Sequence, residues 1–170
     1  MEKVLARLVR REFDLLLRER NPEFTKVQKA EIPPGWCLYK SRNLGEFSCF
    51  ILLAVDPARD WFTVECAWSQ NGEFPAYSIL RRPFDEPKNG ALRFRLAGLW
   101  DGDTHDYWWE LGPKVSPEEE LMSALEGDET LSRERNQAKT LVQSSVLDAI
   151  ENVEVYAIPY FQSRCISLEP

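Results

Sequence analysis

The sequence predicts an α+β fold, with a mainly antiparallel, meandering β-sheet of about five to seven strands flanked by an N-terminal helix and by C-terminal helices. Three observations support this class. Residues 2–19 repeat apolar side chains at helical spacing, residues 24–111 break into short strand-like segments between turn residues, and helical periodicity returns after residue 112. Because helices and strands are segregated along the chain, parallel βαβ units are not expected.

The length suits one domain over residues 1–170. A chain of 170 residues with 44% hydrophobic residues is large enough to bury roughly 70% of its unfolded surface. We therefore expect one hydrophobic core that needs no metal or disulfide to hold it together.

The first segment, residues 2–19, is predicted to be an amphipathic helix. Its apolar face has residues three or four positions apart: Leu5, Leu8, Val9, Phe13 and Leu16. Much of its other face is basic: Lys3, Arg7, Arg10, Arg11 and Arg18. The helix should end at Asn21, because a residue that precedes proline avoids the helical region.

Four strand segments follow. Residues 24–30 predict a weak first strand, and residues 36–40, 47–55 and 61–69 predict three more. The segment 47–55 is apolar on both faces, which indicates a central strand covered on both sides.

Two more strand segments are expected after the hairpin signal at Asn71-Gly72. Residues 74–80 should return along the sheet, with Pro75 restricting them to an edge or a bulge. Residues 92–96 alternate apolar and polar side chains, which predicts a half-buried strand with Arg93 and Arg95 on a wet face.

The stretch LWDGDTHDYWWELGP, residues 99–113, holds the only histidine of the chain. Asp101-Gly102-Asp103 is typical of a turn, and residues 107–111 alternate as a strand does. We interpret the stretch as a hairpin or loop whose aromatic side chains join the sheet, with His105 at the edge of the turn.

The C-terminal third should be mainly helical. Ser116 and Pro117 have the residue types of a helix start, and Gly127 ends this short helix. A longer helix is predicted from about residue 129 to residue 150, followed by a short strand over 153–158 that Pro159 stops.

The cysteines indicate a reducing compartment. Cys37, Cys49, Cys66 and Cys165 are scattered without a C-x-x-C pair, so buried thiols are favoured over disulfides or zinc. No apolar run resembles a signal peptide or approaches the ~18 residues of a membrane span. We expect a cytoplasmic protein that does not bind membranes.

Charge is unevenly distributed along the chain. Residues 101–129 hold ten acidic residues and one lysine, a net charge of −9, which leaves +2 for the rest of a chain whose total is −7. This distribution disfavours nucleic-acid binding, which needs clustered cations. An acidic surface favours a basic protein partner, or it serves only solubility.

His105 is the natural candidate for chemistry, and several alternatives arise around it. Zinc would need more clustered ligands, and the acids of this turn lack the full calcium-loop pattern. Asp103 is better placed than Asp106 to orient His105 for acid–base work. No nucleophile or phosphate-binding motif accompanies them. We assign no catalytic residue and expect no cofactor or metal.

An alternative function is that of an enzyme or small-ligand-binding protein. Its pocket would be formed near the turn by His105, Asp103, Trp108, Arg93 and Arg95. Arg93 and Arg95 share a sheet face. The simpler interpretation is that they form cross-strand ion pairs with Glu65. The more specific alternative is that they form a pocket for an anion or a nucleotide.

Three stretches carry a resemblance: WFTVECAWSQNGEFP, ALRFRLAGLWDGDTHDYWWEL and VEVYAIPYF. They resemble small uncharacterised bacterial α+β proteins, a few of them related to families encoded beside toxin or phage-defence genes. The resemblance implies an interaction module of immunity or defence-accessory type that binds a basic toxin or effector, and the missing catalytic motifs favour a non-catalytic one. Because an unprotected edge strand invites pairing, we expect a monomer or a homodimer. The partner-binding residues expected on the acidic surface are Asp101, Asp103, Glu118, Glu119, Glu120 and Glu126.

Overall fold

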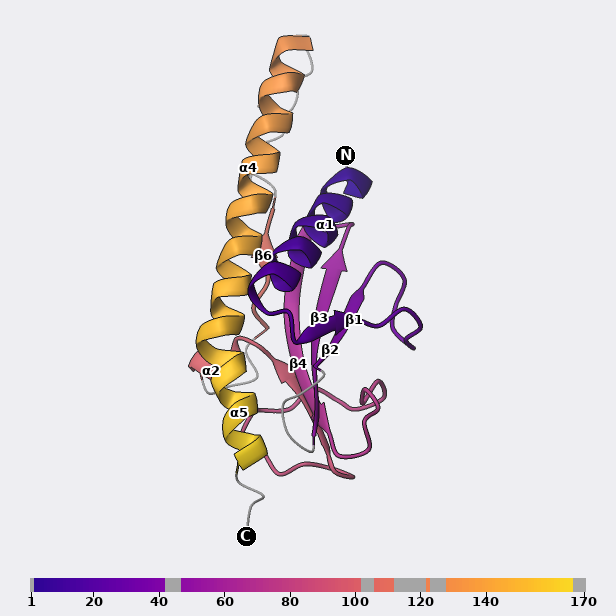
Figure 1. The fold of residues 1–170 in the computed structure, drawn as a ribbon. Helices are drawn as coiled ribbons and strands as arrows, with labels where there is room; N and C mark the ends of the chain where they lie inside the picture. Colours follow the sequence, from indigo (N-terminus) through magenta and orange to yellow (C-terminus); the bar gives the residue numbers. More distant parts are fainter. Residues whose placement is uncertain (1, 42–46, 102–105, 112–121, 123–127, 167–170) are drawn as a thin grey trace.

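The structure, a computed structural model, describes residues 2–41, 47–101, 106–111, 122 and 128–166 (Figure 1). The α+β class is confirmed. Along the chain an N-terminal helix comes first, the strands of a mostly antiparallel sheet follow, and C-terminal helices come last. In space the two long helices lie on one side of the sheet, so the main core forms between helices and sheet (Figure 1).

The N-terminal helix α1 (Glu2–Arg20) forms as the sequence predicts. Its buried side chains follow a four-residue repeat, which places them on one stripe against the sheet and the C-terminal helix: Leu5, Val9, Phe13 and Leu17. The Asn21 backbone N–H donates to the Leu17 carbonyl at 2.8 Å, and Pro22 then ends the helix.

Within the described residues the sheet has six strands. Their bounds are β1 Phe24–Lys26, β2 Cys37–Ser41, β3 Ser48–Asp56, β4 Trp61–Ser69, β5 Ala91–Arg95 and β6 Trp109–Glu110. Strands β1 to β5 are neighbours in chain order, and each pair is antiparallel. The short β6 also pairs with β4, at Trp61 and Phe62, so β5 and β6 share one side of β4 at different positions along it.

Strand β3 confirms the expectation of a central strand covered on both faces. All residues from Cys49 to Val55 are buried. Strand β4 is equally enclosed, and its Phe62, Val64 and Cys66 face the helices while Ala67 faces the opposite layer. The sheet therefore has two covered faces, the second of which is covered by loops.

Two predicted strands are wrong. Residues 74–80 form a loop with a turn at Ala76 and Tyr77, because Pro75 removes a backbone donor and the strand that pairs with β4 is instead β5. Residues 153–158 are helical, within a continuous run made of α4 (Asp128–Asn152), the π-helix η1 (Val153–Ala157) and α5 (Ile158–Ile166).

The helical run at 153–158 has a physical cause in the spacing of its apolar residues. Val153, Ala157 and Phe161 are four residues apart and fully buried, so they form a helical stripe against the core. The N–H of Ile158 donates to the carbonyl of Val153, a wider turn than in an α-helix. This π turn directly precedes Pro159, whose missing N–H would otherwise interrupt the α-helical ladder.

The stretch 99–113 is not a hairpin between two neighbouring strands. Leu99 and Trp100 belong to a short helix, α2 (Gly98–Asp101), and only Trp109–Glu110 joins the sheet as β6. The expectation that aromatic side chains join the core is confirmed for Trp109, which is buried. The predicted helix over 116–127 lies outside the described residues.

The part of the chain that the structure describes contains no helix long and apolar enough to cross a bilayer. Its described cysteines Cys37, Cys49 and Cys66 are all buried and carry thiols. Burial is the largest cause that raises the pKa of the Cys66 thiol, which keeps that sulfur protonated.

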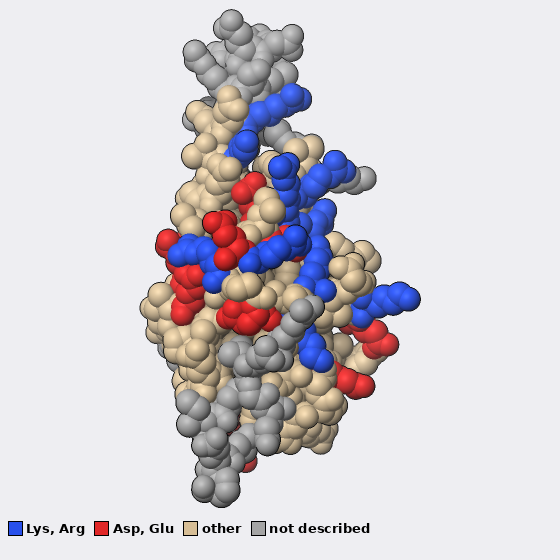
Figure 2. Space-filling view, viewed as in Figure 1, with Lys and Arg blue, Asp and Glu red and all other residues tan. Residues whose placement is uncertain are grey.

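Charged side chains are unevenly distributed over the helical face. Figure 2 shows lysines and arginines gathered over the N-terminal half of α1, whereas acidic side chains lie mainly nearer its C-terminal end. Near that end Arg18 pairs with Asp14 at 2.8 Å and Arg20 with Glu154 at 2.8 Å. These pairs are partly exposed, and each contributes little to stability.

Candidate functional site

The sheet face that turns away from the helices carries a small apolar cluster and a chain of charged side chains. Leu38, Phe50, Leu52 and Ala67 form the cluster, which loops cover through residues that include Trp36 and Phe74. In the antiparallel register Glu65 lies opposite Arg95 and Ala67 lies opposite Arg93. Glu65, Arg93 and Arg95 therefore share this face, as the alternation of residues 92–96 indicates.

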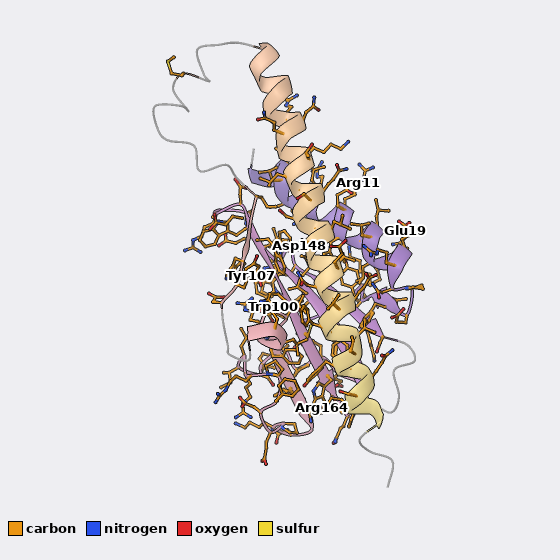
Figure 3. All side chains as sticks on the ribbon, turned by 90° about the vertical axis from the view of Figure 1, so that its left-hand side faces the viewer. Arg11, Glu19, Trp100, Tyr107, Asp148 and Arg164 are labelled. Carbon is orange, nitrogen blue, oxygen red and sulfur yellow. The ribbon has the colours of Figure 1, made fainter. Side chains whose placement is uncertain are left out.

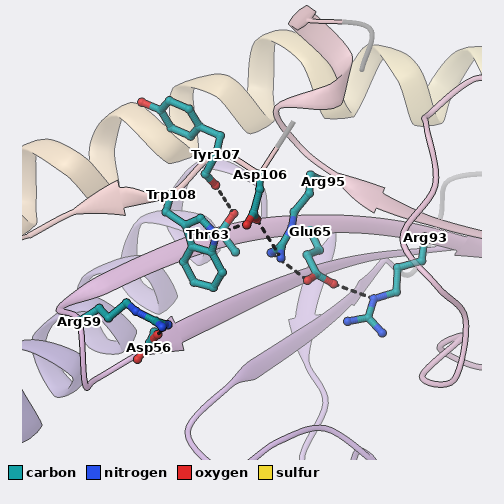
Figure 4. A network of polar contacts seen from close by, with 9 residues as sticks. All are labelled: Asp56, Arg59, Thr63, Glu65, Arg93, Arg95, Asp106, Tyr107 and Trp108. Carbon is teal, nitrogen blue, oxygen red and sulfur yellow. Dashed lines mark hydrogen bonds and ion pairs between the residues drawn. The ribbon is translucent and has the colours of Figure 1, made fainter. Parts of the chain in front are cut away.

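Glu65 bridges the two arginines. Its Oε2 accepts a hydrogen bond from Arg93 Nε at 2.6 Å, and its Oε1 lies 3.0 Å from Arg95 Nη1 (Figure 4). The arginine side chains are 13% exposed and that of Glu65 is 2% exposed. The predicted wet face is therefore wrong, because the segments 73–77 and 106–108 cover it. A buried carboxylate between two guanidinium groups satisfies charges that would be costly to bury alone.

Arg95 continues the chain toward the segment that precedes β6. Its Nη2 lies 3.3 Å from Asp106 Oδ1, and its guanidinium stands over the Trp108 ring at 5.0 Å. The Trp108 indole N–H donates to Asp106 at 2.7 Å, and Thr63 Oγ1 donates to the Tyr107 carbonyl at 2.7 Å (Figure 4). These contacts hold residues 106–108 against the sheet.

Beyond Trp108 the contacts pass to the turn between β3 and β4. The rings of Trp61 and Trp108 lie 6.5 Å apart, and the Arg59 guanidinium stands 5.8 Å from the Trp61 ring. Arg59 is held in turn by Asp56 at 2.8 Å (Figure 4). The contacts thus run from Arg95 through Trp108 and Trp61 to Arg59.

In the other direction Arg93 fixes the loop between β4 and β5. Its Nη1 donates to the Ala76 carbonyl at 3.1 Å, and its guanidinium lies 5.4 Å from the Phe74 ring. The same loop is closed at its base, where the Gln70 N–H donates to the Gly90 carbonyl at 2.9 Å. Gly90 has a φ of +68°, and a Cβ there would meet the Gln70 side chain at 2.6 Å, so this closure needs glycine.

A pocket of about 410 Å³ lies under this loop. Its lining combines apolar side chains, three cations and one carboxylate, and includes Phe74, Tyr77, Ile79, Arg81, Lys88, Arg93 and Glu73. Arg93 is therefore shared between the buried ion pairs and the pocket. The volume is within the range of roughly 300–1,000 Å³ that is typical of ligand sites.

Three large side chains on this loop are exposed, of which Phe84, 71% exposed, lies edge-on to Tyr160 at 5.6 Å and the other two line the pocket. Tyr77 is 90% exposed and Ile79 is 74% exposed. The Tyr77 hydroxyl donates to Glu31 Oε2 at 2.8 Å, and this hydrogen bond is the largest cause that raises the pKa of the phenol. Tyr77 is thus held at its hydroxyl, and the backbone beside it is held through the Ala76 carbonyl.

A second aromatic group fastens the 99–111 stretch to the helical run. Trp109 stacks on Phe62 with centroids 5.2 Å apart, and its indole N–H donates to Asp148 of α4 at 2.7 Å. Tyr107 lies edge-on to Trp109 at 4.9 Å and to Trp100 at 5.8 Å. Figure 3 shows Trp100 and Tyr107 beside the helical run that carries Asp148. Its tryptophans, Trp100 and Trp109, belong to the stretch 99–113 that contains His105.

The structure brings together three of the five residues predicted to form a ligand pocket, Arg93, Arg95 and Trp108. Arg95 and Trp108 are in direct contact, and Arg93 lies on the other side of their shared partner Glu65. His105 and Asp103 lie outside the described residues. The interpretation of Arg93 and Arg95 as cross-strand ion pairs with Glu65 is confirmed.

The expected acidic partner-binding surface lies almost wholly outside the described residues. Asp101 ends helix α2, but its side chain is not described. The other members fall outside as well: Asp103, Glu118, Glu119, Glu120 and Glu126. Among the described residues no three or more His, Cys, Asp or Glu side chains form a group that could hold a metal ion.

Sequence reasoning missed the pocket and the exposed pair at Tyr77 and Ile79. The available signal was a long Pro- and Gly-punctuated segment, residues 70–90, that still carries large apolar side chains. Loops of this length that contain such residues are commonly functional.

Comparison of the chain with protein-family models, with curated proteins and with solved structures gave no match.

Proposed function

We propose that this protein is a protein-interaction module whose contact surface is the loop between β4 and β5. The observation that carries the proposal is the exposure of Tyr77 and Ile79, at 90% and 74%, on a loop that buried contacts hold in place. Scattered exposed apolar residues are ordinary, but two that flank a pocket on a fixed loop are typical of a binding surface.

The fixed loop matters for affinity. Association is opposed by the entropy lost when side chains and loops become ordered. Here the Ala76 carbonyl is bound by Arg93 at 3.1 Å, Tyr77 is bound by Glu31 at 2.8 Å, and the Arg81 N–H donates to the Arg93 carbonyl at 2.9 Å. Much of the ordering cost is therefore met within the folded protein, which supports a role in recognition.

The test compares two double variants in capture experiments from the native cells. Tyr77→Ser with Ile79→Ser removes the apolar pair from the loop. Val4→Ser with Val155→Ser is the matched control, because these residues are 59% and 61% exposed on the helical layer. Proteins retained by the wild type and the control, but lost from the loop variant, would support the proposal.

The opposite pattern would contradict it. If the loop variant retains the same proteins as the wild type, with circular dichroism and unfolding curves unchanged, the contact surface lies elsewhere. If the wild type and the control retain nothing above background, the interaction function itself fails.

A second candidate surface rests on the charge of residues 101–129. Their net charge of −9 favours a basic protein partner, and an electrostatic surface of this kind speeds encounter and makes it salt-dependent. This version of the proposal is an immunity or defence-accessory module that neutralises a cationic toxin or effector. It places the protein in the cytoplasm, where buried thiols such as Cys66 stay reduced.

The small-ligand or enzymatic alternative near His105 receives less support. The Trp108 ring is already covered by Arg95 at 5.0 Å and approached by Trp61 at 6.5 Å. Side chains engaged in this way hold the loop 106–108 in place, which favours a structural role for them.

A further inference from the structure

We infer that the pocket beneath the β4–β5 loop receives the C-terminal end of a partner chain, with its last apolar side chain against Phe74 and Ile79 and its carboxylate near Lys88 and Arg81. The inference rests on the proposed interaction function and names the part of the partner that the loop recognises.

The pocket wall is suited to an apolar side chain. Phe74, Ala76 and Ile79 line it, and Phe74 packs edge-on against the buried Phe50 ring at 5.6 Å. That contact holds the wall in place, so an entering side chain meets an existing apolar surface rather than a collapsed loop. Its burial would contribute roughly 25 cal/mol per Å² of apolar area removed from water.

The charge in the pocket is suited to one carboxylate. Arg93 shares the Glu65 carboxylate with Arg95, whose second partner is Asp106 at 3.3 Å, so these four residues together carry no net charge. The Arg81 guanidinium donates to the Glu86 carbonyl at 2.9 Å, and a neutral acceptor leaves its charge uncompensated. Lys88 forms no ion pair with any residue that the structure describes. With Glu73 as the one acid in the lining, the net charge outside the Arg93–Glu65 pair is +1.

The size of the pocket favours a chain end over a segment that passes through it. A volume of about 410 Å³ lies near the lower limit of ligand sites and suits about one or two residues. A chain terminus ending in an apolar residue presents its side chain and its carboxylate on the same Cα. This is the arrangement that an apolar wall beside unpaired cations can recognise.

The test uses a defined probe on the full-length protein. The probe is a pool of acetylated Gly-Gly-X tripeptides in which X is leucine, isoleucine, valine or phenylalanine, prepared once with a free C-terminus and once as the C-terminal amide. Backbone NMR shifts of Ser78, Arg81 and Ala91 report binding, because these residues line the pocket.

We expect the free-acid pool to shift these amides and to bind at least about tenfold more tightly than the amide pool, since a hydrogen-bonded charge is worth more than a neutral contact. Lys88→Gln should weaken binding of the free acids and leave the amides unchanged. Lys29→Gln is the matched control, because Lys29 is exposed and does not line the pocket.

Equal binding of the two pools, or no shift with millimolar free acid, overturns the inference. An equal effect of the Lys88 and Lys29 substitutions does so too. These failures are distinguishable from failure of the proposed function, because partner capture that still depends on Tyr77 and Ile79 would show that the loop binds something other than a chain end.

Discussion

The carboxylate of Glu65 on β4 lies 2.6 Å from the Nε of Arg93 on β5, and it is almost completely removed from solvent. This contact connects the sheet to the loop surface, because the same guanidinium holds the Ala76 carbonyl and the Phe74 ring. The position of an exposed loop therefore depends on a buried ion pair.

Replacement of Glu65 by glutamine should strongly destabilise the protein. Arg93 and Arg95 would then lose the buried carboxylate between them and keep only the exposed Asp106, 3.3 Å from Arg95. Removing one partner of a buried ion pair typically costs about 3–5 kcal/mol. Urea unfolding measures the loss. The control is Arg18→Gln, which removes the 70% exposed arginine of the pair with Asp14 and should cost under ~1 kcal/mol. Similar losses in the two variants would show that the buried triad is not what holds this face together.

Replacement of Arg93 by lysine should loosen the loop while keeping the charge. A lysine ammonium cannot hold Glu65 and the Ala76 carbonyl in the same fork geometry. Amide hydrogen exchange should therefore quicken at residues 74–79. Arg95→Lys is the control, because it should quicken exchange at 106–108 instead. If both variants loosen the same segment, the two arginines do not hold separate loops.

Replacement of Trp109 by phenylalanine should cost about 1–2 kcal/mol of unfolding free energy. The change keeps an aromatic ring stacked on Phe62 but removes the 2.7 Å hydrogen bond to Asp148. Thermal unfolding of the single variant, of Asp148→Ala and of the pair gives the coupling between the two residues. Simply additive losses would contradict a role for this bond in fastening the 99–111 stretch to α4.

The role of the acidic residues within 101–129 in partner binding can be tested by charge reversal. Glu119→Lys, Glu120→Lys and Glu126→Lys together should weaken binding of a basic partner and flatten its salt dependence, because screening acts on the charges removed. The fold should be retained, since surface substitutions change stability by under ~0.5 kcal/mol each. Unchanged affinity across the salt range would show that the acidic residues within 101–129 serve solubility and do not contact the partner.

Local patterns predicted much of the fold. The repeat of Leu5, Val9 and Phe13 predicted the first helix, and the apolar run 47–55 predicted a strand buried on both faces. Both features depend on neighbours in the sequence. The strand predicted over 153–158 was wrong because Val153 and Val155 alternate as in a strand. In the structure Val153 and Ala157, four residues apart, are both buried in the core, which is the spacing of a helix.

The site was only partly predictable for a different reason. The sequence indicates that Arg93 and Arg95 share a face with Glu65, because strand alternation is local. It does not indicate that the face is covered, since the covering residues come from the loop segments 74–76 and 106–108, whose path across the sheet no local pattern fixes. Burial of these charges, and with it the fixed loop, is a consequence of tertiary packing.

The central claim is that Tyr77 and Ile79 form the surface that a partner contacts. The most direct measurement is amide hydrogen exchange of the protein alone and saturated with the protein that it retains from native cells. We predict that slowed exchange is concentrated at residues 74–81, with little change along α1 and the C-terminal half of α4. Slowed exchange confined to those helices, with 74–81 unchanged, would contradict the claim.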